Sequence, residues 1–173
     1  MDSLFHVGGK PFFSIGGQLN NSTSSDPALT EKAFKTCVGL GLNTVAAPVH
    51  WELFEKEEGA YDFAQIDMLM ELARRSGLRL VVLWFGTWKN GNSHYVPEWV
   101  KLQKERFLWA KANDGAEIRA LSPTCEETKK ADLRAFCELC GHIARNNADG
   151  CVIGIQIENE PGLIGGGKRL FSA

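Results

Sequence analysis

Short apolar segments alternate with amphipathic helical segments along this chain, and that order constrains the fold more than any other feature. Strands are predicted at residues 11–15, 43–49, 78–85 and 152–158, with one helix in each interval between them. The order β-α-β-α-β-α-β is typical of a parallel sheet with right-handed crossover connections. Two α/β architectures satisfy it, namely an open doubly wound sheet and part of a (β/α)8 barrel.

Each predicted helix has one apolar face. The first begins with Asp26 as N-cap and Pro27 in its first turn, the second ends at Gly77, and the third starts near residues 122–124. The predicted buried faces consist of Leu29, Ala33, Cys37 and Leu40 in the first helix, Phe63, Ile66, Met70 and Ala73 in the second, and Leu133, Phe136, Cys137, Cys140, Ile143 and Ala144 in the third.

The composition supports one folded domain over residues 1–173. Apolar residues make up 44% of the chain and charged residues 23%, which is enough apolar material for a core. Lysine and arginine number 19 against 21 aspartates and glutamates, and this net charge of −2 argues against a nucleic-acid partner. No apolar run approaches the roughly 18 residues of a membrane span, so no membrane partner is expected.

Cofactors, metals and disulfides are not expected. Residues 1–15 lack the charged start and apolar stretch of a secretory signal, which predicts a cytoplasmic protein. The 5 cysteines are an odd number scattered along the chain, unlike a disulfide framework. The 4 histidines lack the spacing of metal ligands. Residues 86–125 form a long segment without a clean period, and its three tryptophans favour a functional loop over disorder.

Polar and aromatic residues follow the predicted strands. In both candidate architectures, functional side chains gather at the carboxyl ends of the strands. Amides and carboxylates hydrogen-bond sugar hydroxyls, and indole rings pack on the apolar faces of sugars. The sequence therefore predicts a carbohydrate site formed by Gln18, Asn20, Trp51, Glu52, Trp84, Trp88, Asn90, Glu158, Asn159 and Glu160.

The fourth predicted strand brings carboxylates to this edge of the sheet. Its isoleucines alternate with Gly154, Gln156 and Glu158, and Pro161 favours an extended backbone at Glu160. A glutamic acid at the lip of an apolar barrel is partly desolvated, which favours its neutral form and permits proton donation at neutral pH. The alternative interpretation is an ordinary solvated glutamate at a strand end.

Several segments of the sequence resemble a known family. They are residues 16–22 (GGQLNNS), 43–45 (NTV), 50–55 (HWELFE), 58–63 (EGAYDF) and 156–162 (QIENEPG). The Asn159-Glu160 pair after an apolar strand resembles the acid/base motif of clan A glycoside hydrolases, and the wider pattern is similar to the β-galactosidase-like families 35 and 42. The resemblance covers most of residues 11–162. It implies the N-terminal half of a (β/α)8 barrel, about four βα units.

The resemblance also implies a retaining β-glycosidase that acts on terminal β-linked sugars such as β-galactosides. Glu160 would protonate the leaving oxygen and later deprotonate water, while Asn159 would hydrogen-bond the sugar 2-hydroxyl. The indoles of Trp51, Trp84 and Trp88 would wall the subsite, and Asn90 or Gln18 would reach other hydroxyls. The segment after the third strand departs from the family 35 pattern, in which a glutamate contacts galactose, so the sugar is left open.

A retaining mechanism needs a second carboxylate about 5 Å from the first. The nucleophile of the family comes from the seventh strand, and a complete barrel has about 250 residues, so this chain is expected to contain the acid and lack the nucleophile. Glu158 lies too near Glu160 to face it across a sugar ring, and the family gives Glu52 no such role. The isolated chain is therefore expected to be inactive and to self-associate through open sheet edges.

Two other functions stay open. A truncated, non-catalytic carbohydrate-binding remnant would share all of these residues. A nucleotide-binding α/β domain is the other, because Gly162, Gly167 and Lys168 have phosphate-loop spacing, although Arg169 stands where that motif needs serine or threonine.

Overall fold

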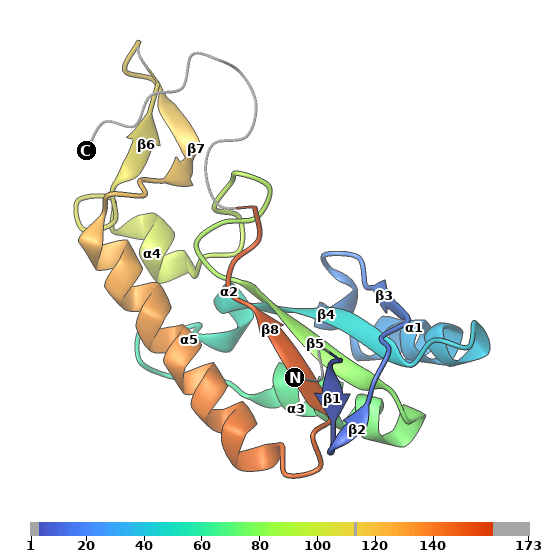
Figure 1. Cartoon of the computed structure of the whole chain (residues 1–173). Helices are drawn as coiled ribbons and strands as arrows, with labels where there is room; N and C mark the ends of the chain where they lie inside the picture. The colour runs from blue at the N-terminus through green and yellow to red at the C-terminus, as the bar shows by residue number, and fades with distance from the viewer. Residues whose placement is uncertain (1–3, 113, 161–173) are drawn as a thin grey trace. The chain divides into compact units, whose positions relative to one another are not determined.

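The computed structural model describes residues 4–112 and 114–160, which form two compact units interleaved along the sequence (Figure 1). Among the described residues, the first unit comprises residues 4–49, 63–83 and 141–156, and the second comprises residues 50–62, 84–112, 114–140 and 157–160. The single domain predicted from composition stays a prediction. The phosphate-loop spacing that begins at Gly162 lies outside the described residues.

The first unit is built on a parallel sheet with the strand order β3-β4-β5-β8. The strands are β3 (Gly16–Gln18), β4 (Thr44–His50), β5 (Arg79–Phe85) and β8 (Val152–Gln156). Gly17 of β3 lies opposite Val45 of β4, and Val82 of β5 lies opposite Ile155 of β8, in parallel register. Figure 1 shows the strands side by side in this order. The sheet confirms the predicted parallel topology, with sequential strands as neighbours.

The helices of the first unit start and end close to the predicted residues. They are η1 (Thr23–Ser25), α1 (Pro27–Gly39) and α3 (Ala64–Ser76). The Asp26 side chain caps α1 by accepting a hydrogen bond from the Leu29 N–H at 3.0 Å. Gly77 ends α3 in a left-handed conformation, with φ 66°, which a glycine adopts without steric cost. Local capping residues thus set the boundaries that the sequence predicts.

The buried face of α1 differs from the predicted one. Thr30, Phe34 and Cys37 are buried, whereas Leu29 and Leu40 are 53% and 70% exposed. The Thr30 hydroxyl donates to two backbone carbonyls of the preceding turn, at 2.9 and 2.6 Å. A hydroxyl that is satisfied in this way can be buried at little cost, and the helix therefore turns the threonine inward. In α3 the predicted residues Ile66, Met70 and Ala73 are buried, as are Leu69 and Leu72.

The third long helix is α5 (Glu126–Asn146), which begins later than the predicted residues 122–124. Its buried residues are Thr128, Ala131, Asp132, Ala135, Leu139 and Ile143. Of the six residues predicted on the buried face, Ile143 is buried and Phe136 and Cys140 are half-buried. Leu133 is 56% exposed and Cys137 and Ala144 are also exposed, so half of the predicted buried face is wrong. The core side of α5 carries two alanines, which permit close packing, and an aspartate that has hydrogen-bond partners there.

The first sheet strand lies later in the chain than predicted. Two short strands, β1 (His6–Val7) and β2 (Lys10–Pro11), pair as an antiparallel hairpin, and β3 begins only at Gly16. A Cβ at residue 16 would lie 3.1 Å from the carbonyl oxygen of Thr44. The backbone of β3 therefore approaches β4 most closely at a residue without a side chain, which an apolar pattern does not reveal.

The segment predicted as a long loop contains regular elements of the second unit. The elements of this unit are α2 (Trp51–Phe54), α4 (Glu98–Leu102), β6 (Trp109–Lys111), β7 (Glu117–Leu121) and the first part of α5. β6 and β7 pair antiparallel, with Trp109 opposite Leu121. The largest fully buried side chains of this unit include those of Trp51, Phe54, Trp84, Phe85 and Phe107. Aromatic residues thus form much of its core.

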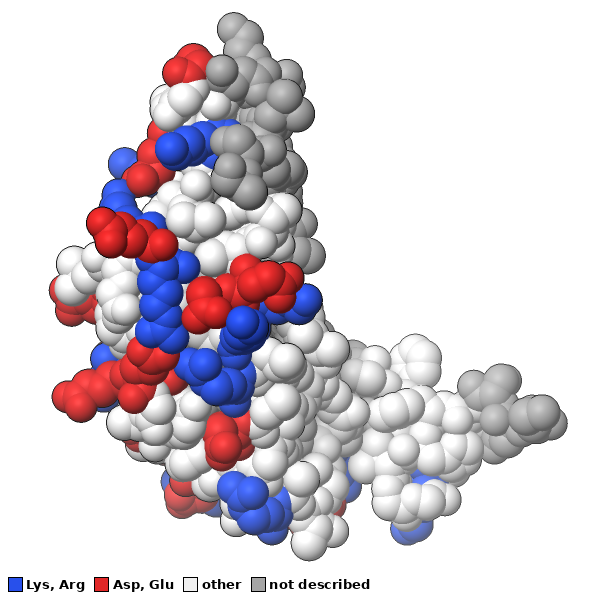
Figure 2. Space-filling view, turned by 90° about the vertical axis from the view of Figure 1, so that its left-hand side faces the viewer, with Lys and Arg blue, Asp and Glu red and all other residues white. Residues whose placement is uncertain are grey.

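Basic and acidic side chains are interleaved on the face drawn in Figure 2. Glu58 contacts Arg106 at 2.7 Å and Arg134 at 3.0 Å, and Lys130 contacts Glu127 at 3.0 Å. Such exposed pairs contribute little to stability, and they balance the charge of this face. In the part of the chain that the structure describes, no helix combines the length and the apolar character needed to cross a membrane.

Candidate active site

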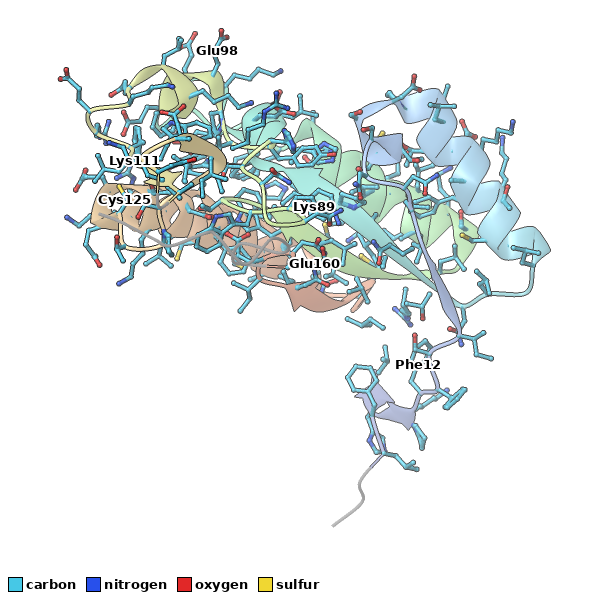
Figure 3. The ribbon with its side chains drawn as sticks, turned by 90° about the horizontal axis from the view of Figure 1, so that it is seen from above. Phe12, Lys89, Glu98, Lys111, Cys125 and Glu160 are labelled. Carbon is cyan, nitrogen blue, oxygen red and sulfur yellow. The ribbon has the colours of Figure 1, made fainter. Side chains whose placement is uncertain are left out.

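Two segments that follow neighbouring strands meet in the second unit. Residues 86–90 follow β5, and residues 157–160 follow β8. A parallel bridge joins Lys89 of the first segment to Asn159 of the second. Figure 3 labels Lys89 and Glu160, one residue from each segment. Two of the strand ends predicted to carry function are therefore joined through their backbones.

The carboxyl groups of Glu158 and Asp132 form a pair at this contact, because both accept a hydrogen bond from the same backbone N–H group, that of Thr87. The Thr87 N–H donates to both groups, at 2.8 Å to Asp132 Oδ2 and at 3.0 Å to Glu158 Oε1. The Trp88 N–H donates to Glu158 Oε2 at 3.1 Å, and Trp84 Nε1 donates to Asp132 Oδ1 at 2.7 Å. The Thr87 hydroxyl also donates to Asp132 Oδ2. Each carboxyl oxygen of the pair therefore accepts at least one hydrogen bond within the protein.

The pKa of Glu158 is raised to about 9, first by burial and then by the charge of Asp132 and the hydrogen bond to it. The N–H groups of Trp88 and Thr87 act in the opposite direction because they stabilise the ionised form. This direction of shift favours the protonated form of the Glu158 carboxyl group at neutral pH. The sequence predicts a desolvated acid at this strand end, and the structure places one two residues before Glu160.

Gly86 allows the backbone to pass directly beside the pair. A Cβ at residue 86 would clash with Trp84 Nε1 and would lie 2.7 Å from both carboxyl oxygens of Asp132. Side-chain atoms do not tolerate such contacts without movement, and only glycine leaves the hydrogen bond between Trp84 and Asp132 intact at this place.

Lys89 is a buried cation beside Asn159, with 8% of its surface exposed. Its Nζ donates to Asn159 Oδ1 and to Asn90 Oδ1, both at 2.6 Å, and lies 5.0 Å from the centroid of the Phe85 ring. Because the amide oxygen of Asn159 faces the ammonium group, its NH2 group is directed elsewhere and can donate to another acceptor.

A second buried acid, Glu55, holds the core around Trp51. Its carboxyl group accepts hydrogen bonds from Trp51 Nε1 and from the Gly59 N–H, both at 2.7 Å. The Trp99 indole donates to the Glu55 carbonyl oxygen at 3.0 Å and packs edge-on against Trp51, with ring centroids 6.1 Å apart. Burial raises the pKa of Glu55, and the Trp51 and Gly59 donors oppose this shift.

Replacing Glu55 by alanine is expected to lower the free energy of unfolding by about 2 kcal/mol. The substitution leaves the Trp51 indole N–H and the Gly59 N–H without their acceptor. Urea denaturation of the chain measures the change. The control is Glu57→Ala at an exposed position, where a change within about 0.5 kcal/mol is expected. Equal losses for the two variants would contradict this role of Glu55.

An apolar pocket of about 310 Å³ borders the carboxyl pair. Trp88, Phe136 and Ile157 supply apolar walls, and Glu158 and Asp132 supply polar edges. Trp88 is half-buried, and its Nε1 donates to the Leu121 carbonyl oxygen at 3.3 Å. Among the three tryptophans predicted to wall the sugar site, Trp88 is the one with substantial exposed surface.

Glu160, predicted as the proton donor, is exposed and has φ 52°. This left-handed conformation differs from the extended one expected before a proline. The strand predicted to run to Glu158 ends at Gln156, and Glu158 has φ 144°. The chain therefore turns out of the sheet before it reaches the two glutamates, and their side chains no longer follow the strand alternation.

The other predicted sugar-binding residues lie in different environments. Trp51 and Trp84 are 0% and 1% exposed, so both are core side chains in this structure. Glu52 contacts Lys101 at 3.2 Å. Gln18 and Asn20 belong to the first unit, where both are exposed. The roles of these residues in sugar binding stay predictions.

The sequence pattern does not mark Gly86, Lys89 or Asp132 as parts of the site. A signal exists for Asp132, which is a charged residue at helical spacing from Ala135 and Leu139 on the buried face of α5. A carboxylate in such a stripe needs partners, and its hydrogen bonds are the consequence. No local pattern identifies the other two, because each also has a partner distant in the sequence, namely Asn159 for Lys89 and Asp132 for Gly86.

The family model described as "Glycosyl hydrolases family 35" matches residues 4–171. A beta-galactosidase of Xanthomonas manihotis is 25% identical over 157 residues, which cover 89% of this chain and 24% of that protein. An exo-beta-D-glucosaminidase of Pyrococcus horikoshii is 28% identical over 140 residues, which cover 70% of this chain and 17% of that protein. The chain therefore spans about a quarter or less of the curated relatives it matches.

Solved structures of other proteins share the fold. The catalytic domain of beta-amylase from Paenibacillus polymyxa has a TM-score of 0.60 at 21% identity, covering 81% of this chain and 35% of that one. An exo-beta-1,4-mannosidase from Opitutaceae bacterium strain TAV5 has a TM-score of 0.67 at 20% identity, covering 93% and 28%. With the parallel sheet, these likenesses confirm the predicted fold, which is part of a (β/α)8 barrel.

Proposed function

This chain belongs to glycosyl hydrolases family 35, and from that premise we propose that it carries the acid/base half of a β-galactosidase-like retaining glycosidase site. The strongest support is that Asn159 and Glu160 lie in the short segment that follows β8, and that Asn159 is bridged to Lys89 in the segment that follows β5. In (β/α)8 barrels the catalytic side chains come from this edge of the sheet.

In the proposed mechanism, Glu160 donates its proton to the glycosidic oxygen as the bond to the leaving group breaks. The resulting carboxylate then accepts a proton from the water that hydrolyses the glycosyl-enzyme intermediate. Asn159 donates a hydrogen bond from its amide NH2 group to the sugar 2-hydroxyl. Lys89 supports this geometry because it holds the amide oxygen of Asn159 at 2.6 Å.

The nucleophile of the proposed site is a second carboxylate about 5 Å from Glu160. We assign it to polypeptide outside residues 1–173, since the chain covers 24% of the related beta-galactosidase. A complete barrel of about 250 residues brings carboxylates from other strands to the same edge. Two carboxyl groups suffice for this chemistry, and the proposed mechanism uses no cofactor.

The proposed substrate is a terminal β-linked galactoside or a related sugar. The identity of 25% with a beta-galactosidase supports it. Residues 84–91 contain no acidic residue, although the family resemblance leads us to expect a glutamate that contacts galactose there. This segment has a buried cation, Lys89, and no glutamate. The test therefore compares several sugars.

The test uses the natural polypeptide that contains residues 1–173. It is expected to hydrolyse nitrophenyl β-galactoside faster than the β-glucoside, β-mannoside and β-glucosaminide, and NMR is expected to show the β anomer as the first product. An α anomer as first product would contradict the retaining mechanism. If another β-glycoside is hydrolysed faster, that sugar replaces galactose as the proposed substrate. Sugar binding without turnover would favour the carbohydrate-binding alternative.

The 173-residue chain alone is expected to give no measurable turnover of nitrophenyl β-galactoside, because the proposed nucleophile is missing. It is also expected to self-associate in analytical ultracentrifugation through β3 and β8, the outer strands of the four-stranded sheet. Turnover by the pure chain that disappears in Glu160→Gln would contradict the assignment of the nucleophile to other polypeptide.

A further inference from the structure

We propose that Asp132 and Glu158 share one proton and that this carboxyl pair is a positioning device for Asn159 and Glu160. The inference rests on the proposed function, since the position of Glu160 matters for catalysis only if it is the acid. It gives Glu158 a positioning role in place of the sugar contact predicted from the sequence.

The two carboxyl groups converge on one donor. The Thr87 N–H lies 2.8 Å from Asp132 Oδ2 and 3.0 Å from Glu158 Oε1, which brings the two acids together. Asp132 is 9% exposed, and Glu158 is also largely removed from solvent. Two ionised carboxylates this close repel each other, whereas a single proton between them converts the repulsion into a hydrogen bond.

The surrounding donors place the shared proton on Glu158. Asp132 accepts hydrogen bonds from Trp84 Nε1 and from both the N–H and the hydroxyl of Thr87. A group that accepts from three donors is best matched by an ionised carboxylate, which has acceptor sites only. Asp132 is therefore the acceptor of the pair, and Glu158 donates to it.

The pair anchors a strained backbone that leads to Glu160. Glu158 has φ 144° and Glu160 has φ 52°, both in the region that favours glycine. Such conformations persist only where neighbouring contacts hold them. The backbone N–H groups of Thr87 and Trp88 donate hydrogen bonds to the Glu158 carboxyl group. These bonds hold the first of the two strained residues in place. Loss of the anchor is expected to release the strain and to move the Glu160 carboxyl group.

Other titratable groups face the pair from three elements. Cys125, just before α5, and Lys129, in the first part of α5, line the same pocket as both acids, and Lys129 Nζ lies 3.5 Å from Glu126. Lys89, after β5, approaches through Asn159 and donates to amide oxygens. Glu160 belongs to the same segment as Glu158. Their charges modulate the pair and are unchanged in the variants used below.

A shared proton makes stability depend on pH. The ordinary pKa of a glutamate is 4.5, and the pKa of Glu158 in the folded protein is about 9. Between these values the folded state holds one proton more than the unfolded state. Stability from this group is therefore full at low pH and falls as pH rises, with the unfolding equilibrium constant growing about tenfold per pH unit up to pH 9.

Glu158→Gln and Asp132→Asn separate the two partners. A glutamine at position 158 can donate from its Nε2 to Asp132 and accept the Trp88 N–H, while the Thr87 N–H keeps Asp132 as its acceptor. An asparagine at position 132 has one oxygen, and so its NH2 group faces either Trp84 Nε1 or the Thr87 N–H. The first exchange keeps the hydrogen bond from the Trp88 N–H and a donor toward Asp132, and it loses only the longer bond from the Thr87 N–H to residue 158. The second leaves one of the donors to residue 132 without an acceptor.

Chemical denaturation across pH measures the first consequence. Glu158→Gln is expected to remove most of the pH dependence between pH 5 and 9 and to exceed the wild type in stability near pH 8. Asp132→Asn is expected to be less stable than the wild type throughout. Infrared difference spectra between wild type and Glu158→Gln are expected to contain the carbonyl band of a protonated carboxyl group at pH 7. The proposal of a shared proton would be overturned if that band is absent, or if Glu158→Gln and Asp132→Asn change the free energy of unfolding equally.

Kinetics of the natural polypeptide test the positioning role. Glu158→Leu removes the anchor and is expected to lower kcat about 100-fold, with a smaller change in KM. Glu158→Gln is expected to recover the larger part of that loss and to extend activity to higher pH than in the wild type. Equal losses in both variants would overturn the positioning role. If the wild type hydrolyses no glycoside, the proposed function fails and the positioning role with it, while the infrared band still decides the shared proton.

Discussion

Replacing Glu160 by glutamine in the natural polypeptide is expected to lower kcat/KM for alkyl β-galactosides about a thousandfold, because the amide cannot protonate a departing alkoxide. The loss depends on the leaving group. Dinitrophenolate departs without a proton, so the rate of formation of the glycosyl-enzyme from dinitrophenyl β-galactoside is expected to fall about tenfold or less. Steady-state and pre-steady-state kinetics with the two substrates measure this difference.

The second step gives an independent test of the same residue. Without Glu160 as base, water attacks the glycosyl-enzyme slowly, whereas azide needs no deprotonation and is expected to restore turnover as β-galactosyl azide. The matched control is Glu98→Gln, an exposed glutamate on α4 labelled in Figure 3, which is expected to keep wild-type kinetics. A uniform loss for both leaving groups, without azide rescue, would contradict the acid/base role.

Strong local periods made part of the fold predictable. β4 and β5 lie within one residue of the predicted ranges 43–49 and 78–85, because a continuous apolar run is typical of a strand buried on both faces. α3 follows its apolar stripe and ends at Gly77, as its period and its glycine indicate. In these elements, side-chain pattern and terminal residues favour the same structure.

Burial that depends on hydrogen bonds could not be read from apolar periodicity. Thr30 is buried in α1 because its hydroxyl bonds two carbonyls, and Asp132 is buried in α5 because Trp84 and Thr87 donate to it. A pattern that ranks residues by hydrophobicity turns both outward and chooses Leu29 or Leu133 instead. In α5, the side of the helix that is buried depends on hydrogen-bond donors distant in the sequence. In α1, it depends on carbonyl groups of the preceding turn.

The candidate site was predictable in its location and less so in its detail. The sequence predicts functional carboxylates after the fourth apolar strand, and the structure places Glu158 and Glu160 after β8. The sequence predicts that Glu160 is the desolvated acid. In the structure Glu160 is exposed, and it is the pKa of Glu158 that is raised, first by burial and then by the charge of Asp132. That difference arises because the chain leaves the sheet after Gln156, a turn that the sequence alternation does not mark.

Gly86→Ala is expected to lower the free energy of unfolding by about 3 kcal/mol, the upper end of the usual cost of overpacking. The added methyl group would clash with Trp84 Nε1 and meet both Asp132 oxygens at 2.7 Å. These atoms are joined by a hydrogen bond of 2.7 Å and belong to buried side chains, so neither can move away without losing its partner. Urea denaturation of the chain measures the loss.

The matched control is Gly39→Ala, where the added Cβ has no neighbour within 4 Å and which is expected to be neutral or slightly stabilising because alanine favours the helix. If the carboxyl pair positions Glu160, Gly86→Ala should also lower kcat in the natural polypeptide, although residue 86 has no side chain that could touch a sugar. A stable Gly86→Ala protein with an unperturbed pH dependence of unfolding would contradict the close approach of this backbone to Asp132. Loss of stability together with loss of that pH dependence is the combination expected only if the backbone at residue 86 and the shared proton belong to one arrangement.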